Sequence, residues 1–227
     1  MSTDRMLAVI WTMAIVSIGA AASAQTIDFE QFENRDNIFG LDLGGVSLRP
    51  RFGSQVHVYA DNFVGNGHHS PVNSIIASNG GRWQPLVGEF DEPQGFIRLW
   101  GGDDGFDDDQ WEFEAFDAHG ASLGIVQSPV WNGKPYTSLT IRADGIMSFE
   151  ARFIGQSDAE IAFDDLEFVP EGGCRADLNG DGNVNTQDFI EFLNAWAGDH
   201  LRADWNGDGA INTQDFIAYL NEWAAGC

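Results

Sequence analysis

The last quarter of the chain is a tandem repeat, and this repeat constrains the fold more than any other feature of the sequence. Residues 176–197 and 203–224 align at an offset of 27, and only 6 of the 22 aligned positions differ. Each copy starts as a loop rich in Asp, Asn and Gly and continues into a run with helical periodicity. A duplication this close predicts two equivalent loop–helix units at the end of the chain.

Each loop carries oxygen-bearing side chains at positions 1, 3, 5, 9 and 12 and a glycine at position 6 (Gly182 and Gly209). Calcium takes six to eight hard oxygen ligands, including the backbone carbonyl at position 7, and a 12-residue loop that turns at a glycine can wrap around it. Three carboxylates in one small loop repel each other unless a cation neutralises them, so we expect this segment to fold with calcium. Magnesium is the weaker candidate, and a pair of metal-free acidic turns is the alternative. The expected ligands of the first ion are Asp177, Asn179, Asp181, Asn183, Asn185 and Asp188, and those of the second are Asp204, Asn206, Asp208, Ala210, Asn212 and Asp215.

The residues after each loop predict one helix with an apolar face. Apolar side chains recur at i, i+3, i+4 and i+7, which places them on one side of a helix. Two helices this short can bury such faces only against each other. The expected faces are Phe189, Phe192, Leu193 and Trp196 in the first copy, and Phe216, Tyr219, Leu220 and Trp223 in the second.

The paired loops, each followed by a single helix, resemble a type I dockerin module. The terminal Gly-Cys also resembles a class of secreted bacterial proteins whose dockerin-like tails end in these two residues. Dockerins bind cohesin domains, so the resemblance implies a cohesin-like protein or a cell-surface scaffold as the partner. A purely structural calcium cap is the alternative. The resemblance also implies recognition positions, which here are Thr186, Gln187, Leu193 and Asn194 in the first copy and Thr213, Gln214, Leu220 and Asn221 in the second.

The two cysteines, Cys174 and Cys227, both lie in this C-terminal part. A short start that carries Arg5 is followed by an apolar run and an Ala-x-Ala site at Ala22–Ala24. This order predicts a signal peptide over residues 1–24 and an oxidising compartment. A Cys174–Cys227 disulfide is therefore the simplest expectation, and a free Cys227 used for covalent attachment is the alternative. We expect a secreted protein, extracellular or associated with the cell surface, with no membrane span after cleavage. The net charge of −24 argues against binding to nucleic acid or to anionic membranes.

Residues 25–170 have the pattern of an antiparallel β-sandwich. Nine short runs rich in Val, Ile, Phe and Trp are separated by turn residues, and several of them alternate strictly. We expect hairpin turns within residues 116–124 and at Asp144-Gly145. A Pro/Gly linker at 171–173 separates this region from the dockerin-like domain at 174–227. The stretches 106–124 and 161–169 resemble galactose-binding-like jelly-roll modules, which favours a jelly-roll-like sandwich.

Three features of the sandwich are candidate sites. The acidic loop with Asp103, Asp104, Asp107 and Asp109 is a candidate for a further calcium ion or is a solvated acidic loop. Trp83 and Trp131 stand beside turn residues, where they could stack on sugar rings or form half-buried sheet edges. We expect Trp100 and Trp111 to be core residues.

Glu112 and Glu114 lie two residues apart on one predicted strand face, a pattern that some sandwich glycosidases use. An exposed charged face explains the pair more simply, so we favour a non-catalytic protein. The sequence thus predicts a secreted β-sandwich anchored through a calcium-binding module, with a polysaccharide as one candidate ligand. A small polysaccharide-degrading glycoside hydrolase and a structural display protein are the alternatives.

Overall fold

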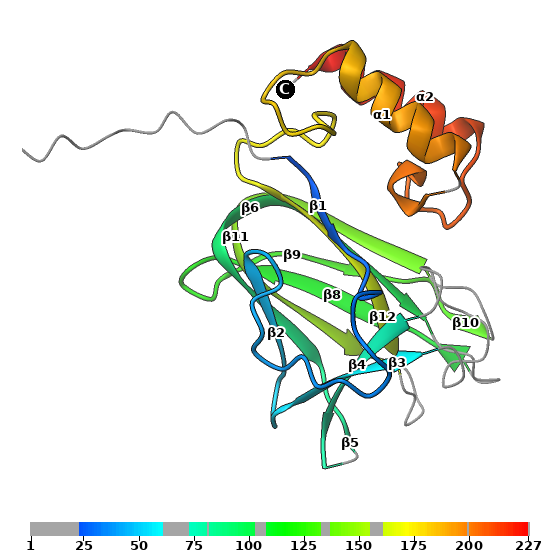
Figure 1. Ribbon diagram of the computed structural model, residues 1–227. Helices are drawn as coiled ribbons and strands as arrows, with labels where there is room; N and C mark the ends of the chain where they lie inside the picture. Colours follow the sequence, from blue (N-terminus) through cyan, green and yellow to red (C-terminus); the bar gives the residue numbers. More distant parts are fainter. Residues whose placement is uncertain are drawn as a thin grey trace, which may run out of the picture.

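The computed structural model describes residues 23–60, 73–80, 82–102, 108–132, 137–154, 161–198 and 200–226. These residues form a mainly β protein with antiparallel strands, followed by two helices (Figure 1). The strands are β1 (Gln25–Ile27), β2 (Val46–Pro50), β3 (Gln55–Ala60), β4 (Asn73–Asn79), β5 (Arg82–Trp83), β6 (Leu86–Gly102), β7 (Asp108–Asp109), β8 (Trp111–Phe116), β9 (Ser122–Gln127), β10 (Trp131–Asn132), β11 (Thr137–Phe153) and β12 (Ala162–Pro170). Within the described part of the chain, no helix is long and apolar enough to span a membrane.

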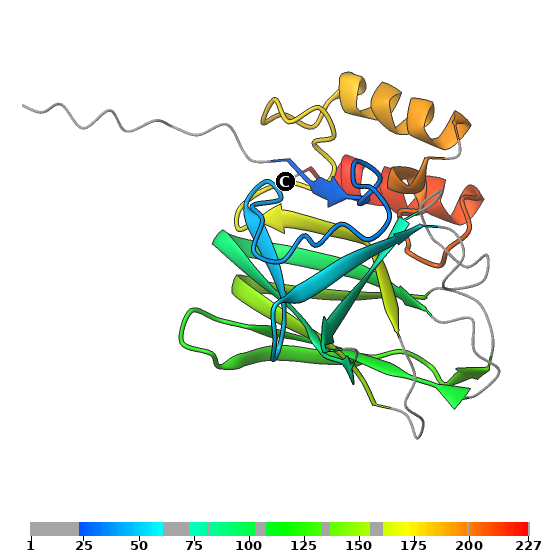
Figure 2. The same ribbon diagram turned by 60° about the horizontal axis from the view of Figure 1, so that its bottom comes forward.

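One curved sheet encloses the core of the sandwich. Its strands follow the order β3-β4-β12-β6-β11-β8-β9, with β1 beside β12, β2 beside β6 and β5 beside β4. The two longest strands, β6 and β11, have 17 residues each, and β6 pairs with β2 along its first part and with β12 along its second. The sheet therefore curves (Figure 2) around its main hydrophobic core. This core contains Trp111, Phe113, Phe149 and Phe168.

One of the two predicted hairpin turns is confirmed and the other is wrong. Between β8 and β9 the chain reverses at Asp117, whose backbone N–H donates to the carbonyl of Ala121 at 3.0 Å. At Asp144-Gly145 the strand β11 instead continues through a register shift between Arg142 and Ile146. The reason is the neighbouring strand β6, which is equally long and keeps β11 paired on both sides of the irregularity.

The sequence pattern did not indicate strand β4. Six of its seven residues are buried, so it lacks the alternation of a half-exposed strand. It is hydrogen-bonded between β3 and β12, and side chains on both of its faces are buried.

The C-terminal module contains α1 (Thr186–Ala197), a short 3-10 turn at Leu201–Ala203 and α2 (Thr213–Ala225). The predicted burial of the two helices against each other is confirmed. Phe192 of α1 stacks on Tyr219 of α2 with 4.0 Å between ring centroids and 2° between ring planes, and neither residue is exposed. Figure 2 shows α2, rather than α1, on the side of the sandwich.

Candidate functional site

The first aspartate of each loop closes that loop around its carboxylate. Asp177 accepts hydrogen bonds from the backbone N–H groups of Gly180, Asp181 and Gly182 at 2.9, 3.1 and 2.8 Å. Asp204 does the same with the equivalent residues of the second loop, at 2.8, 3.1 and 2.9 Å. The two loops therefore share the hydrogen-bond pattern around their first aspartate.

The last aspartate of each loop ties the loop to the helix that follows. Asp188 is fully buried and accepts from the backbone of Asn179 at 3.1 Å and of Asn185 at 2.8 Å. Asp215 occupies the equivalent place in the second copy. Each carboxylate also completes a capping box at its helix N-terminus, which is why the helices begin at Thr186 and Thr213.

Three carboxylates converge in the second loop. The carboxylate oxygens of Asp204, Asp208 and Asp215 lie within 4.8 Å of one another, and Asp204 and Asp215 are buried. Burial raises the pKa of Asp215, and the charges of Asp204 and Asp208 raise it further, against the backbone hydrogen bonds that Asp215 accepts. A bound cation would relieve this repulsion, so the residues present fit a calcium ion.

The asparagines at position 9 act as helix caps. The side chain of Asn185 accepts from the backbone N–H of Gln187 at 2.8 Å and donates to the carbonyl of Asn183 at 3.1 Å. Asn212 donates to the carbonyl of Ala210 at 2.8 Å. Position 9 of such loops commonly reaches the ion through a water molecule, which is compatible with this capping role.

The eight residues that the resemblance assigns to partner recognition lie on the two helices, and their exposure is the same in both copies. Six of them are exposed, while Leu193 and Leu220 are half-buried. Sequence analysis missed Ile190 and Ile217, which are 51% and 56% exposed and lie one helical turn before these two leucines. The sequence contained a signal for their exposure, because both isoleucines are apolar residues that fall outside the i, i+3, i+4, i+7 pattern of the buried face.

Several candidates in the sandwich lie wholly or partly outside the described residues. This holds for Asp103, Asp104 and Asp107 and for the side chains of Asp109 and Trp131. The backbones of Asp109 and Trp131 pair with each other in a two-stranded ladder, β7 with β10. Trp83 is half-buried against a small cluster around Ile76 and Trp100, as expected for a sheet-edge residue.

Glu112 and Glu114 do share one face of the sheet, but they are not an exposed pair. Glu112 is only 7% exposed and forms an ion pair with Arg152. Arg152 also pairs with Glu114 at 3.1 Å and with Glu150 at 3.2 Å. The expectation of an exposed charged face is therefore corrected: three carboxylates converge on one arginine of β11.

A groove of about 400 Å³ lies on the same face of the sheet. Its lining includes Arg51, Phe52, Phe116 and Glu150, and Arg51 pairs with Glu150 at 2.9 Å. Phe52 is 64% exposed and its ring lies 5.9 Å from the Arg51 guanidinium carbon. The groove thus combines an exposed aromatic ring with charged hydrogen-bonding groups.

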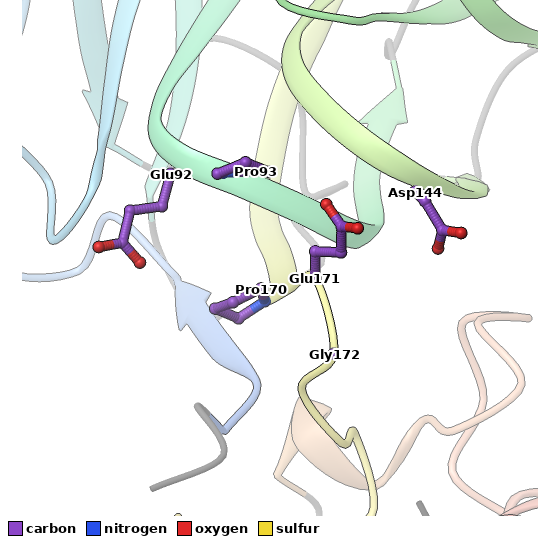
Figure 3. Close-up of a pocket in the computed structure, with 6 residues that line it drawn as sticks. All are labelled: Glu92, Pro93, Asp144, Pro170, Glu171 and Gly172. Carbon is purple, nitrogen blue, oxygen red and sulfur yellow. The ribbon is translucent and has the colours of Figure 1, made fainter. Parts of the chain in front are cut away.

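A second pocket, of about 740 Å³, lies where the sandwich joins the linker. Glu92, Asp144 and Glu171 surround it, with Pro93, Pro170 and Gly172 between them (Figure 3). The three carboxylates do not converge on one point in Figure 3, which distinguishes this pocket from the calcium loop.

The predicted disulfide stays a prediction. Cys174 is buried, at 7% exposed, and Cys227, its expected partner, lies outside the described residues.

No protein-family model matches the chain, and no curated protein matches it either. Among solved structures, the chain is similar to the K1 cleaved adhesin domain of Lys-gingipain from Porphyromonas gingivalis W83, with 13% identity over 65% of this chain and 98% of that one and a TM-score of 0.43. It is also similar to the family 11 carbohydrate-binding module from Clostridium thermocellum, with 10% identity over 61% and 95% of the two chains and a TM-score of 0.32. With TM-scores below 0.5, these similarities assign neither a family nor a ligand to this chain.

Proposed function

We propose that this is a secreted, non-catalytic protein whose C-terminal module binds two calcium ions and attaches the β-sandwich to a cohesin-like protein or a cell-surface scaffold. The convergence of Asp204, Asp208 and Asp215 in a closed loop is the observation that carries the proposal. The first loop repeats the same backbone geometry around Asp177 and Asp188, which supports a second ion. The partner in this proposal comes from the dockerin resemblance, in which the calcium-loaded module is the part that binds another protein.

The surface of the helices supports attachment. Ile190 and Ile217 are exposed apolar side chains at equivalent positions of the repeat, among the exposed polar residues that the resemblance assigns to recognition. Single exposed apolar residues are common, but the same residue exposed twice at matching positions fits a surface that a partner covers. Because both copies present this surface, one partner could bind in either of two orientations.

Isothermal titration calorimetry on the whole protein tests calcium binding. The unmodified protein should bind two ions, and Asp177→Asn and Asp204→Asn should each remove one. A Glu89→Gln variant is the control, because Glu89 is an exposed carboxylate of β6 that pairs with Arg49 of β2. Stoichiometry below one ion in the unmodified protein would refute the metal sites.

A pull-down from the secreted proteins of the source organism, with and without chelator, tests attachment. The partner should be retained only with calcium, and Ile190→Asp combined with Ile217→Asp should abolish its retention. If the partner is still retained in chelator and by the double variant, the module is not the site of attachment and has a structural role alone.

We further propose that the Cys174–Cys227 disulfide closes the module into one loop. Titration of the denatured protein with a thiol reagent should then find no free thiol, whereas two reactive thiols would favour the alternative in which Cys227 is used for attachment.

The groove at Phe52 favours carbohydrate as the ligand of the sandwich. An exposed ring can stack on a sugar while arginine and carboxylate groups hydrogen-bond its hydroxyls. Affinity electrophoresis through a panel of soluble polysaccharides should show retardation that Phe52→Ala abolishes. Phe39→Ala is the matched control, since Phe39 is 39% exposed and is not in the lining of the groove. Release of reducing sugar that Glu112→Gln abolishes would favour the glycoside hydrolase alternative.

A further inference from the structure

Among the described residues, hydrogen bonds from the sandwich strands reach the second loop and not the first. Arg98 of β6 donates from Nη1 to the carbonyl of Asp204 at 3.1 Å and from Nη2 to the carbonyl of Trp205 at 3.0 Å. Ser138 of β11 donates from Oγ to the carbonyl of Gly207. These three carbonyls belong to positions 1, 2 and 4 of the loop, which is the part that wraps around the ion.

The arginines that contact the second loop belong to a buried network of charged side chains. Arg98, Arg175 and Glu167 are 3%, 5% and 8% exposed. Glu167 accepts from Arg175 at 2.6 and 3.2 Å and forms an ion pair with Arg98 at 3.4 Å. Arg175 also donates to the carbonyl of Trp205 at 2.9 Å. Charges are buried to this degree only where they are paired and hydrogen-bonded, so the contact is a specific interface rather than a surface touch.

The two copies of the repeat differ at this interface. Two of their six differences place Trp205 and Glu222 in the second copy where the first has Leu178 and Ala195. The Arg175 guanidinium carbon lies 3.7 Å from the Trp205 ring centroid. Glu222 accepts from the Trp205 indole and pairs with Arg142 of the sandwich at 3.0 Å. Leucine and alanine offer neither contact, so the second copy is specialised for docking.

The first loop has its own supports within the module. Arg202 donates to the carbonyl of Leu178 at 3.2 Å, and the Trp223 indole donates to the carbonyl of Asn185 at 2.8 Å. The two loops therefore share the backbone hydrogen bonds to their first and last aspartates but have different surroundings.

We propose that the sandwich is part of the second calcium site: docking on Arg98 and Ser138 holds the loop in its ion-binding conformation, and calcium in that loop stabilises the contact between the module and the sandwich. The inference rests on calcium binding by this loop. Because the same backbone segment must be ordered for docking and for binding, each event lowers the entropic cost of the other. The coupling is reciprocal: docking raises the affinity for calcium by the same factor by which bound calcium favours docking. The positive charge of Arg98 would oppose a nearby cation, but Glu167 lies beside Arg98 and compensates for it.

Two matched glycines provide the test. Gly180 and Gly207 occupy position 4 of the two loops with φ of 72° and 75°, so alanine introduces the same left-handed strain at both. A Cβ at Gly207 would overlap Ser138 Oγ and lie 3.1 Å from the Arg98 guanidinium carbon. A Cβ at Gly180 would meet only the side chain of Ser23, which lies in the predicted signal peptide. Calorimetry on the full chain measures each substitution in a background that lacks the other calcium site. Gly207→Ala is therefore combined with Asp177→Asn, and Gly180→Ala is combined with Asp204→Asn.

We expect Gly207→Ala to weaken its site more than Gly180→Ala weakens the first site, by a factor within the usual range for coupled sites of about 5 to 150. Equal losses at the two sites would overturn the inference while leaving calcium binding intact. If neither loop takes up calcium in the unmodified protein, the proposed function fails instead. Ser138→Ala is the milder variant, because it removes one hydrogen bond to the second loop without adding an atom; it should weaken only the second site.

Hydrogen exchange supplies a readout that is independent of affinity. With saturating calcium, Asp204→Asn should increase amide exchange in residues 96–102 and 137–140, and Asp177→Asn should leave it unchanged. Equal protection of these segments in both variants would also overturn the inference.

Discussion

Replacement of Phe192 by alanine should make the fold of the module dependent on the calcium concentration. Phe192 is fully buried and stacks on Tyr219, so the substitution leaves a cavity between the two helices. Removal of a buried phenylalanine costs about 3–5 kcal/mol. A module of this size has little stability to lose, so we expect it to unfold in chelator.

Calcium should restore the variant. A ligand that binds only the folded state adds about 2.7 kcal/mol per site when its free concentration is 100 times the dissociation constant. Two sites therefore contribute about 5.4 kcal/mol, which offsets the loss at Phe192. Helical circular dichroism at 222 nm, recorded during thermal unfolding in chelator and at stepwise calcium concentrations, measures the effect.

Phe113→Ala in the core of the sandwich is the matched control. Phe113 is also fully buried, so its removal should destabilise the sandwich while the helical signal keeps the calcium dependence of the unmodified protein. If the Phe192→Ala variant keeps its helical signal in chelator, or if saturating calcium does not restore that signal, the reasoning is refuted.

Three further predictions concern the surface, the interface and the core. Ile190→Asp and Ile217→Asp should change the free energy of unfolding by less than about 0.5 kcal/mol in urea titrations, because both side chains are exposed; a larger loss would show that they support the fold. Burial raises the pKa of Glu167, but Arg175 and Arg98 outweigh this effect and hold the pKa below its ordinary value of 4.5. The folded protein then binds fewer protons than the unfolded protein between the two pKa values, so this contribution is complete above pH 4.5 and is lost as the pH falls through the lowered pKa. Urea titrations from pH 2.5 to 6 should show a smaller loss in Glu167→Gln than in the unmodified protein, and equal losses would contradict the assignment. Gly88→Ala should destabilise by about 1–3 kcal/mol, because its Cβ would overlap the Phe149 ring, whereas Gly124→Ala should have little effect because its Cβ would meet only Ile141 at 3.6 Å.

The sequence was most informative where the decisive interactions are local. Each loop and its helix are defined by residues within one repeat, so spacing alone indicated the closed loops, the helices and their shared apolar core. The turn at Asp117 was predictable for the same reason, since its carboxylate accepts from the backbone N–H groups of His119 and Ala121.

Prediction failed where distant segments decide the outcome. Asp144-Gly145 has turn chemistry, but the long strand β6 keeps β11 in the sheet. Arg98 is separated from Asp204 by 106 residues, so spacing could not indicate that the second loop docks on the sandwich. Glu112 looked like part of an exposed pair because its partner Arg152 lies 40 residues away.

The buried network of Arg98, Glu167 and Arg175 also determines how far the module can be separated from this protein. A tag cut out after Pro170 would carry Arg175 and Trp205 to a new host without the carboxylate of Glu167 that pairs with Arg175. The remaining sandwich would expose Arg98 and Glu167, two charges that the module now covers. The C-terminal module is therefore not a portable unit, and transplanting it to another protein requires β6 and β12 to move with it.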